Sequence, residues 1–437
     1  MPARRACIAG VGETAYAKWG GITDASEYQL AVRAVLAAVE DAGFAVEDVD
    51  GLASFADDRN AAVFMAADLG IAELRYATMS WLPGGGGACA AVANAAMAVE
   101  TGQAEVVVVY RSLCQGQFRR FGRGPGNQPP AWGGSGESSS SGEAGSAVPG
   151  DAGRSAGSGG GRTPRTPGVR RARSLLEAHV AFTMPFGMFG PPIAYAMVAR
   201  RHMHRYGTTP EQFGAVAVTT RAHAQRNRRA VMYGRPMTLD DYLASRPVSD
   251  PFRLFDCCLE TDGACAVVVT TPERAADARS APVEVLASAQ GTLRGFGHGQ
   301  YSNVSMPDDD YSSAGARQVA ERLWERAGLD PEDVDVAEVY DHFTGMVVCA
   351  LEDFGFCKPG EGGPFVASGA IAWPDGSLPM NTHGGSLSEA YVHGLNHVVE
   401  AVRQLRGQSA CQVDGAETAL VTSAAGVPTS ALVLGRP

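Results

Sequence analysis

Short apolar runs alternate along the chain with segments of helical periodicity. Residues 7–11 and 51–55 are short and mostly apolar, as strands are, whereas residues 27–42 place apolar side chains on one face of a helix. A second helix is predicted over about 88–101, and it leads into an apolar strand over 105–110. This strand–helix–strand alternation predicts α/β layers with a mainly parallel sheet.

The chain repeats part of this pattern. Residues 41–50 and 326–335 match at most positions, and in both a helix is expected to end at glycine and a strand to follow a Val-Asp pair. Likewise, a helix that runs into Gly102 and a helix that runs into Gly407 each precede an apolar strand. Two matches in the same order predict a duplicated architecture, with an N-terminal half over 1–275 and a C-terminal half over 276–437.

One region interrupts the N-terminal half. Residues about 115–245 are expected to form a cap or loop region, and within it residues about 123–171 consist mainly of Gly, Ser, Pro and Arg. Such a segment cannot bury enough apolar surface to offset the entropy of ordering it, so we expect a disordered insertion that acts as a solvated linker. Contact of its arginines with an acidic partner or with phosphates is the alternative.

Composition narrows the class of protein. The hydrophobic content of 45% is that of a globular protein with a sizeable core, and the formal net charge of −11 argues against nucleic-acid binding. The nine cysteines include no CxxC pair, which indicates a reducing cytoplasmic compartment rather than a disulfide framework or a zinc site. No stretch approaches 18 apolar residues and the first residues lead into a strand, so we expect neither a membrane span nor a signal segment.

Two glycine-rich motifs carry the chemistry. One is Gly-Gly-Gly-Gly-Ala-Cys-Ala-Ala at 84–91, and the other is Asn-Thr-His-Gly-Gly-Ser-Leu-Ser-Glu-Ala-Tyr-Val-His-Gly at 381–394. The glycine run lacks the spacing of a P-loop or of a dinucleotide fingerprint. Its backbone N–H groups, at the start of a predicted helix, are instead suited to hold an oxyanion.

These motifs resemble the two reactive loops of the thiolase superfamily, and the resemblance extends over nearly the whole chain apart from the insertion. Within the superfamily the chain is similar to the lipid-transfer-protein branch (sterol-carrier-type, thiolase-like), in particular to the actinobacterial steroid side-chain-cleaving aldolases. The supporting stretches are 91–102, 199–204, 256–264, 339–343 and 351–357. The resemblance implies the five-layer αβαβα fold, a homodimer, an acyl-CoA substrate with no further cofactor, and a small partner protein of the zinc-ribbon/OB-fold type.

The resemblance also assigns positions. Thiolases carry a nucleophilic Cys at the start of a buried helix, and the register of residues 94–102 puts that position at Gly85, four residues before Cys89. Cys89 is either a substitute nucleophile in contact with substrate or a small buried side chain. Tyr340 and Tyr391 stand where the related thiolases carry their acid/base histidines, so the resemblance implies that these phenols handle protons. Glycine at position 85 is expected to leave room for a bulky acyl group.

Neighbouring residues are candidates for supporting roles. We expect His383 to donate a hydrogen bond to the thioester oxygen, and Gly384 and Gly385 to permit a tight turn and close approach of the thioester. His342, two residues after Tyr340, is either a structural neighbour of that phenol or a catalytic group. No grouping of His, Asp and Glu in the sequence has the spacing of a metal site.

The predicted reaction is a retro-aldol cleavage of a bulky β-hydroxyacyl-CoA, such as a steroid side-chain thioester, to a ketone and a short acyl-CoA such as propionyl-CoA. A base removes the β-hydroxyl proton, the carbon–carbon bond breaks, and an acid protonates the thioester enolate at Cα, so no acyl-enzyme is required. A phenol has an ordinary pKa of about 10, which suits it to give a proton. The alternatives are a thiolase-type acyltransferase that uses Cys89 and a non-catalytic subunit that binds acyl-CoA or lipid.

Overall fold

The structure is a computed structural model, and it describes residues 5–56, 58–80, 84–117, 184–188, 190–293, 312–423 and 428–437. The insertion predicted over about 123–171 lies outside these residues. The strands are β1 (Cys7–Glu13), β2 (Ala17–Lys18), β3 (Gly51–Phe55), β4 (Tyr76–Ser80), β5 (Val106–Cys114), β6 (Pro247–Ser249), β7 (Phe252–Arg253), β8 (Thr261–Thr270), β9 (Val283–Gly291), β10 (Val336–Glu338), β11 (Thr418–Ser423) and β12 (Thr429–Gly435).

The helices predicted over 27–42 and about 88–101 are confirmed, and none of the described helices is long and apolar enough to cross a membrane. They are α1 (Glu27–Ala42), α2 (Ala62–Leu69), α3 (Ala88–Glu100), α5 (Pro191–Tyr206), α6 (Pro210–Ala224), α7 (Leu239–Leu243), α8 (Pro272–Ala275), α10 (Arg317–Ala327), α11 (Thr344–Asp353), α12 (Gly362–Ala367), α13 (Gly385–Ser388) and α14 (Leu395–Arg406).

Local chemistry explains where these helices begin and end. Ser26 and Gln29 form a capping box at the start of α1, and Gly43 ends that helix in the left-handed conformation. In contrast to the amphipathic α1, helix α3 is apolar and buried over most of its length, because it lies between two layers of sheet. Its many alanines allow that close packing.

The sheet is mixed in direction. Its order is β10-β11-β12-β9-β1-β8-β5-β3-β4, with β2 paired to β8. Parallel pairing joins β3 to β4 and to β5, and β10 to β11, where helices cross between the strands. The remaining pairs of this sheet are antiparallel, as between β11 and β12, which follow each other along the chain with no helix between them.

The strand order shows the duplication that the sequence predicts. The run β3-β5-β8-β1 in the first part of the chain corresponds to β10-β11-β12-β9 in the second, with the same directions between neighbours. Even β4 has a counterpart, because Met380 forms a parallel bridge to Ala337 of β10. The predicted boundary at 275–276 falls at the end of α8, between β8 and β9, and it stays a prediction.

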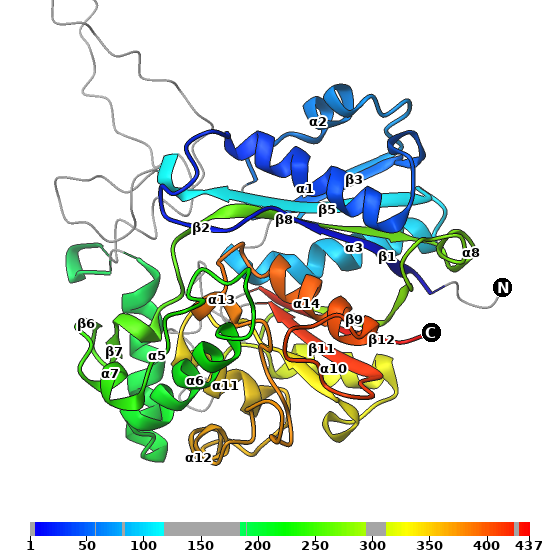
Figure 1. Ribbon diagram of the computed structural model, residues 1–437. Helices are drawn as coiled ribbons and strands as arrows, with labels where there is room; N and C mark the ends of the chain where they lie inside the picture. Colours follow the sequence, from blue (N-terminus) through cyan, green and yellow to red (C-terminus); the bar gives the residue numbers. More distant parts are fainter. Residues whose placement is uncertain are drawn as a thin grey trace, which may run out of the picture.

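Five layers result (Figure 1). Helix α1 covers the outer face of the N-terminal part of the sheet, and α10 covers the outer face of the C-terminal part. Helices α3 and α14 lie between the two parts and pack against both. This is the αβαβα order that the resemblance implied. Helices α5, α6, α7, α11 and α12 gather beside the C-terminal part, and the starts of α3 and α14 face the site described next.

Candidate active site

Two tyrosine hydroxyls meet in the structure. Tyr340 follows β10, and Tyr391 lies between α13 and α14. The Tyr340 hydroxyl donates a hydrogen bond to the Tyr391 hydroxyl across 2.9 Å. Tyr340 is buried and Tyr391 is partly exposed. Thr261 of β8 fixes the backbone of Tyr391 through bonds of 2.9 and 3.0 Å to its N–H and carbonyl groups. The two phenols singled out in the sequence therefore share one site.

Two glycines at the starts of the central helices enclose the Tyr340 ring. A Cβ atom at Gly85, before α3, would lie 2.0 Å from Cζ of Tyr340. A Cβ atom at Gly394, the N-cap of α14, would lie 2.9 Å from Cδ2 of the same ring, and Gly394 has a left-handed φ of 88°. The expected room for an acyl group at Gly85 is thus wrong, because the Tyr340 ring fills that space.

The surroundings of Tyr340 keep its hydroxyl protonated. Burial raises the pKa of Tyr340 well above its ordinary value, and the neighbouring Tyr391 and Cys258 raise it further. A buried phenolate has no solvent to stabilise its charge, so the neutral form is favoured. At neutral pH Tyr340 is therefore a proton donor.

The residues before and after Tyr340 are both hydrogen-bonded to the loop over 381–394. Asn381 accepts from the Val339 N–H group and donates to the Val339 carbonyl, both at 2.8 Å. Asp341 accepts from the Ser386 N–H group at 2.7 Å. Because the residues before and after Tyr340 are both tied to the loop, the distance between the two phenols is set by buried hydrogen bonds rather than by solvent-exposed chain.

Gly384 and Gly385 form the predicted tight turn, with φ angles of 112° and 60°. A Cβ atom at Gly385 would lie 2.1 Å from Oδ2 of Asp341, and one at Gly384 would lie 2.8 Å from Cβ of Ala224. The close approach that these glycines permit is therefore to Asp341 and to helix α6. The approach of a thioester to these glycines stays a prediction.

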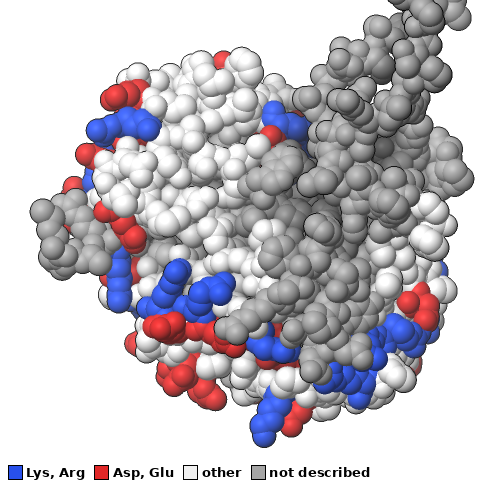
Figure 2. Space-filling model, turned by 180° about the vertical axis from the view of Figure 1, so that it is seen from behind, with Lys and Arg blue, Asp and Glu red and all other residues white. Residues whose placement is uncertain are grey.

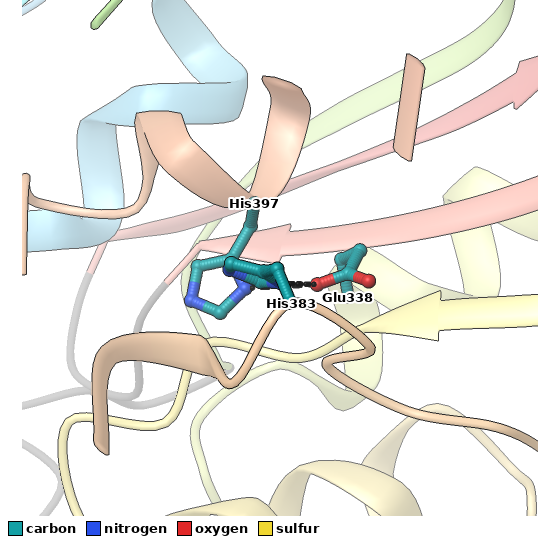
Figure 3. Close-up of side chains that lie close together, drawn as sticks. All are labelled: Glu338, His383 and His397. Carbon is teal, nitrogen blue, oxygen red and sulfur yellow. Dashed lines mark hydrogen bonds and ion pairs between the residues drawn. The ribbon is translucent and has the colours of Figure 1, made fainter. Parts of the chain in front are cut away.

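A network of buried ions lies next to Tyr340, whose ring centroid is 6.1 Å from that of His397, and Figure 3 shows three of its members, Glu338, His383 and His397. Oε2 of Glu338 lies 3.1 Å from Nδ1 of His383 and 3.2 Å from Nδ1 of His397. The second nitrogens also face carboxylates, His383 Nε2 at 3.5 Å from Glu389 and His397 Nε2 at 3.2 Å from Asp341. All five side chains are buried. Asp341 connects the network to the backbone that holds Tyr340.

This placement overturns the role expected for His383. Both of its nitrogens face carboxylates, so neither is available to a thioester oxygen. Burial opposes its charge, but Glu389 and Glu338 prevail and raise the pKa of His383 to about 10. In turn, although burial opposes it, His383 lowers the pKa of Glu338 to about 2. His383 is therefore a charged structural partner at neutral pH.

Glu338, His383 and His397 also have the spacing of a metal site, which the sequence did not reveal. One donor atom from each lies within 4.8 Å of the others. A metal ligand has to be a neutral imidazole, whereas the carboxylates hold the pKa values of both histidines above the ordinary range. We therefore interpret this cluster as an ion network.

The network predicts how stability depends on pH. Because the pKa of Glu338 is lowered, its ion pairs stabilise the fold fully above pH 4.5, and this stabilisation is lost as the pH falls toward 2. Because the pKa of His383 is raised, its ion pairs stabilise the fold fully below pH 6.5, and this stabilisation is lost as the pH rises toward 10. We expect the midpoint of thermal unfolding, measured by calorimetry, to be highest between pH 4.5 and pH 6.5 and to fall toward pH 10. A His383→Gln variant should show a weaker alkaline fall, and an equal fall in both proteins would contradict the assignment.

His342 packs against the rings of Tyr340 and Tyr195 without a hydrogen bond to either. Its ring centroid lies 4.9 Å from that of Tyr340 and 4.6 Å from that of Tyr195, and both of its ring nitrogens are buried without a hydrogen-bond partner. Burial lowers the pKa of His342 to about 3, so the ring is neutral. Of the two alternatives given for His342, the structure favours the structural neighbour of Tyr340.

Cys89 is a small buried side chain. It is fully buried, its thiol donates to the Val421 carbonyl at 3.4 Å, and its backbone N–H donates to Ser423 Oγ at 2.9 Å. Burial raises the pKa of Cys89 to about 12. The interpretation of Cys89 as a substrate-contacting nucleophile is therefore wrong, because the reactive thiolate is disfavoured and the sulfur is out of reach.

A Cys89→Ala variant is accordingly expected to keep its turnover. Loss of the buried sulfur should lower the free energy of unfolding by roughly 1 kcal/mol, since about one methylene equivalent of packing is removed. Urea titration measures the stability, and intact-protein mass spectrometry after incubation with an acyl-CoA should reveal no acyl-enzyme in the unmodified protein. A trapped acyl group on Cys89 would restore the acyltransferase alternative.

Arg111 and Asp58, near the phenols, escaped the sequence analysis. Arg111 of β5 contacts both Asp58 and His393, and His393 lies edge-on to Tyr391 with ring centroids 5.1 Å apart. The signal in the sequence was a charged side chain directly after the apolar run of 106–110. Its partner His393 lies 282 residues away, which no local pattern reveals.

Comparisons with known proteins agree with this geometry. Residues 297–435 match the family model described as Thiolase C-terminal domain-like. The chain is 42% identical over 438 residues to a 17-hydroxy-3-oxo-4-pregnene-20-carboxyl-CoA lyase of Mycobacterium tuberculosis, with 100% of each chain covered. It is 40% identical over 431 residues to a steroid side-chain-cleaving aldolase of Thermomonospora curvata, covering 98% of this chain and 97% of that protein.

Solved structures agree as well. The structure of an Ltp2-ChsH2(DUF35) aldolase matches with a TM-score of 0.82 and 38% identity over 99% of this chain and 98% of that chain. Human mitochondrial 3-ketoacyl-CoA thiolase matches with a TM-score of 0.65 at 14% identity over 100% of both chains, which supports the fold alone.

Proposed function

Because the chain belongs to the steroid side-chain-cleaving aldolases of the thiolase superfamily, we propose that it cleaves a bulky β-hydroxyacyl-CoA by a retro-aldol reaction. The observation that carries this proposal is the pair of phenols 2.9 Å apart in a site whose nucleophile position is Gly85. A site with proton donors and no thiolate is suited to break a carbon–carbon bond without an acyl-enzyme.

The name of the mycobacterial relative describes a substrate of this class. In 17-hydroxy-3-oxo-4-pregnene-20-carboxyl-CoA the thioester is attached to C20 and the hydroxyl to the adjacent C17, which makes it a β-hydroxyacyl thioester. Cleavage of the C17–C20 bond gives a 17-ketone and propionyl-CoA. We propose the same class of products, a ketone and a short acyl-CoA, for this chain.

The phenol pair supplies the proton transfers. The electron pair of the Cα–Cβ bond moves onto Cα and the thioester oxygen as that bond breaks. In the same relay one phenol takes up the β-hydroxyl proton while it passes its own proton across the hydrogen bond between Tyr340 and Tyr391, and the other phenol gives its proton to Cα, so the pair begins and ends neutral. This avoids a lasting phenolate at Tyr340, which its raised pKa disfavours.

Cations beside the reactive loop support an acyl-CoA substrate. Arg221 donates to Ser388 Oγ at 2.9 Å, three residues before Tyr391, and to the carbonyl of Arg235 at 3.2 Å. Burial, followed by Arg235 and Arg221, lowers the pKa of Lys18, so these cations share one neighbourhood. We propose that they attract the phosphates of CoA.

We propose a homodimer through the edge of β4 that pairs with no other strand in the described part of the chain. This strand ends the sheet, and Met79 on β4 and Met97 on α3 are 44% and 47% exposed. Figure 2, the view from behind, shows a broad stretch without acidic or basic side chains over the upper part of the molecule. An unpaired strand edge with exposed apolar side chains is a template for pairing with another chain.

The matched Ltp2-ChsH2(DUF35) aldolase is named for two components, which supports a small partner, and for this partner we propose a zinc-ribbon/OB-fold protein. We propose a reducing cytoplasmic location, which the nine free cysteine thiols support.

Product analysis tests the proposed function. The protein, alone and with such a partner, is incubated with a panel of β-hydroxyacyl-CoA thioesters, and mass spectrometry follows the ketone and the short acyl-CoA. We expect both products in equal amounts. Binding of the thioesters with no product would favour the non-catalytic alternative, and transfer of an acyl group to free CoA would favour the acyltransferase.

A further inference from the structure

A buried ion pair from the N-terminal half holds His393 beside Tyr391. Nε and one terminal nitrogen of Arg111 lie 3.2 and 3.0 Å from Nδ1 of His393, and the other terminal nitrogen donates to Asp58 at 2.8 Å. The side chains of Arg111 and Asp58 are only 4% and 0% exposed. His393 itself has a left-handed φ of 51°, a conformation that non-glycine residues rarely adopt and that its surroundings have to maintain.

These contacts fix the protonation of His393. A guanidinium has only donors and keeps its charge in proteins, so the Nδ1 atom that it contacts has to accept. The ring proton then resides on Nε2. Burial, followed by Arg111 and Arg59, lowers the pKa of His393 well below its ordinary value. His393 is therefore a neutral imidazole with one defined N–H group.

That N–H group is available beside the phenols. The His393 ring stands at 83° to the Tyr391 ring, it is partly exposed, and its Nε2 has no hydrogen-bond partner among the described residues. The other imidazoles of the site differ. Both nitrogens of His342 are buried, and both nitrogens of His383 face carboxylates. Of these three imidazoles, His393 is the one placed to reach a ligand.

We propose that the Nε2–H group of His393 donates a hydrogen bond to the thioester oxygen of the substrate as the Cα–Cβ bond breaks. This inference rests on the proposed function. In that step the β-hydroxyl loses its proton to the phenol pair, the electrons of the broken bond spread over Cα and the thioester oxygen, and Cα regains a proton. A fixed donor aimed at that oxygen stabilises the enolate as its charge develops.

A neutral imidazole suits this task better than a charged one. It donates a hydrogen bond to the enolate oxygen but has no acidic proton to transfer to it. Protonation is thereby left to the phenols, which deliver the proton to Cα. Arg111 and Asp58 are positioning residues in this scheme, because they act only through the tautomer and orientation of His393.

The test compares His393→Leu, which removes the donor, with His393→Gln, which keeps an N–H donor. The readouts are kcat and KM for a β-hydroxyacyl-CoA and the exchange of Cα hydrogen of propionyl-CoA in D₂O, which requires enolate formation without carbon–carbon cleavage. We expect His393→Leu to lower kcat and the rate of Cα hydrogen exchange by about 10²–10³-fold, with little change in KM. The kcat and the exchange rate of His393→Gln should lie between those of His393→Leu and the unmodified protein.

The outcomes separate this inference from the proposed function. If the unmodified protein catalyses cleavage and exchange and the rates of His393→Leu lie within about fivefold of its rates, the proposed role of His393 is overturned. The proposed aldolase function is retained in that case. If the unmodified protein neither cleaves nor exchanges any thioester, the proposed function fails and takes the inference with it. Circular dichroism of both variants establishes that they fold, and the partial rescue by Gln separates loss of the donor from loss of packing.

A second comparison tests the positioning role. Arg111→Met combined with Asp58→Asn removes the ion pair without leaving a buried charge unpaired. The groups that face His393 are then Arg59 and Tyr391, and the pKa of His393 should rise because Arg111 no longer opposes its charge. We expect the acidic limb of kcat/KM to move to higher pH. If the acidic limb of kcat/KM stays at the same pH, the proposal that Arg111 controls the tautomer of His393 is overturned.

Discussion

Removal of either phenolic hydroxyl, by Tyr340→Phe or by Tyr391→Phe, is expected to lower kcat for a β-hydroxyacyl-CoA by about two to four orders of magnitude. Each hydroxyl is the hydrogen-bond partner of the other at 2.9 Å, so the loss of one interrupts proton movement from the β-hydroxyl to Cα. Phenylalanine keeps the ring that fills the space beside Gly85, so the fold should persist.

Steady-state kinetics with product detection measures this effect. The double variant is expected to lose about as much as either single variant, because groups that act as one unit are not additive. Tyr28→Phe is a matched control, since its hydroxyl bonds to Asp68 on the outer side of the molecule and should leave turnover unchanged. Full activity in both site variants would remove the phenols from the mechanism.

Gly85→Ala is expected to inactivate the enzyme and to destabilise the fold by about 1–3 kcal/mol. The new Cβ atom would lie 2.0 Å from Cζ of Tyr340, so the ring has to move and the contact with Tyr391 is lost. Gly85→Cys should fail in the same way rather than create an acyltransferase, because its Cβ atom meets the same ring.

Thermal denaturation and kinetics measure this pair of effects. Gly190→Ala serves as the control, because a Cβ atom there meets nothing closer than 3.9 Å. The stability loss of Gly85→Ala should largely disappear when Tyr340 is also changed to Ala, since the two residues compete for one space. Retained turnover in Gly85→Ala would mean that the Tyr340 ring lies elsewhere.

Much of the fold was predictable because its signals are local. The apolar face of residues 27–42 gave the bounds of α1, and the repeated Ala-Gly and Val-Asp positions indicated two similar halves. The meeting of Tyr340 and Tyr391 was foreseen from the resemblance to thiolase loops. Two such loops converge in that fold, so residues at their equivalent positions share one site.

The supporting residues were less predictable because their roles depend on distant partners. His383 lies in the expected turn, but Glu338 and Glu389 decide where its nitrogens face. The room expected at Gly85 depended on a ring contributed from far along the chain. A turn sequence indicates where the backbone bends, whereas it says little about which charges surround a side chain.

The contact between position 85 and the Tyr340 ring also bears on how such an enzyme arises. A side chain at one position and a phenol at the other exclude each other. A cysteine at position 85 and the Tyr340 ring where it now lies cannot coexist, so conversion between a cysteine-dependent site and this one involves both positions rather than one exchange at position 85.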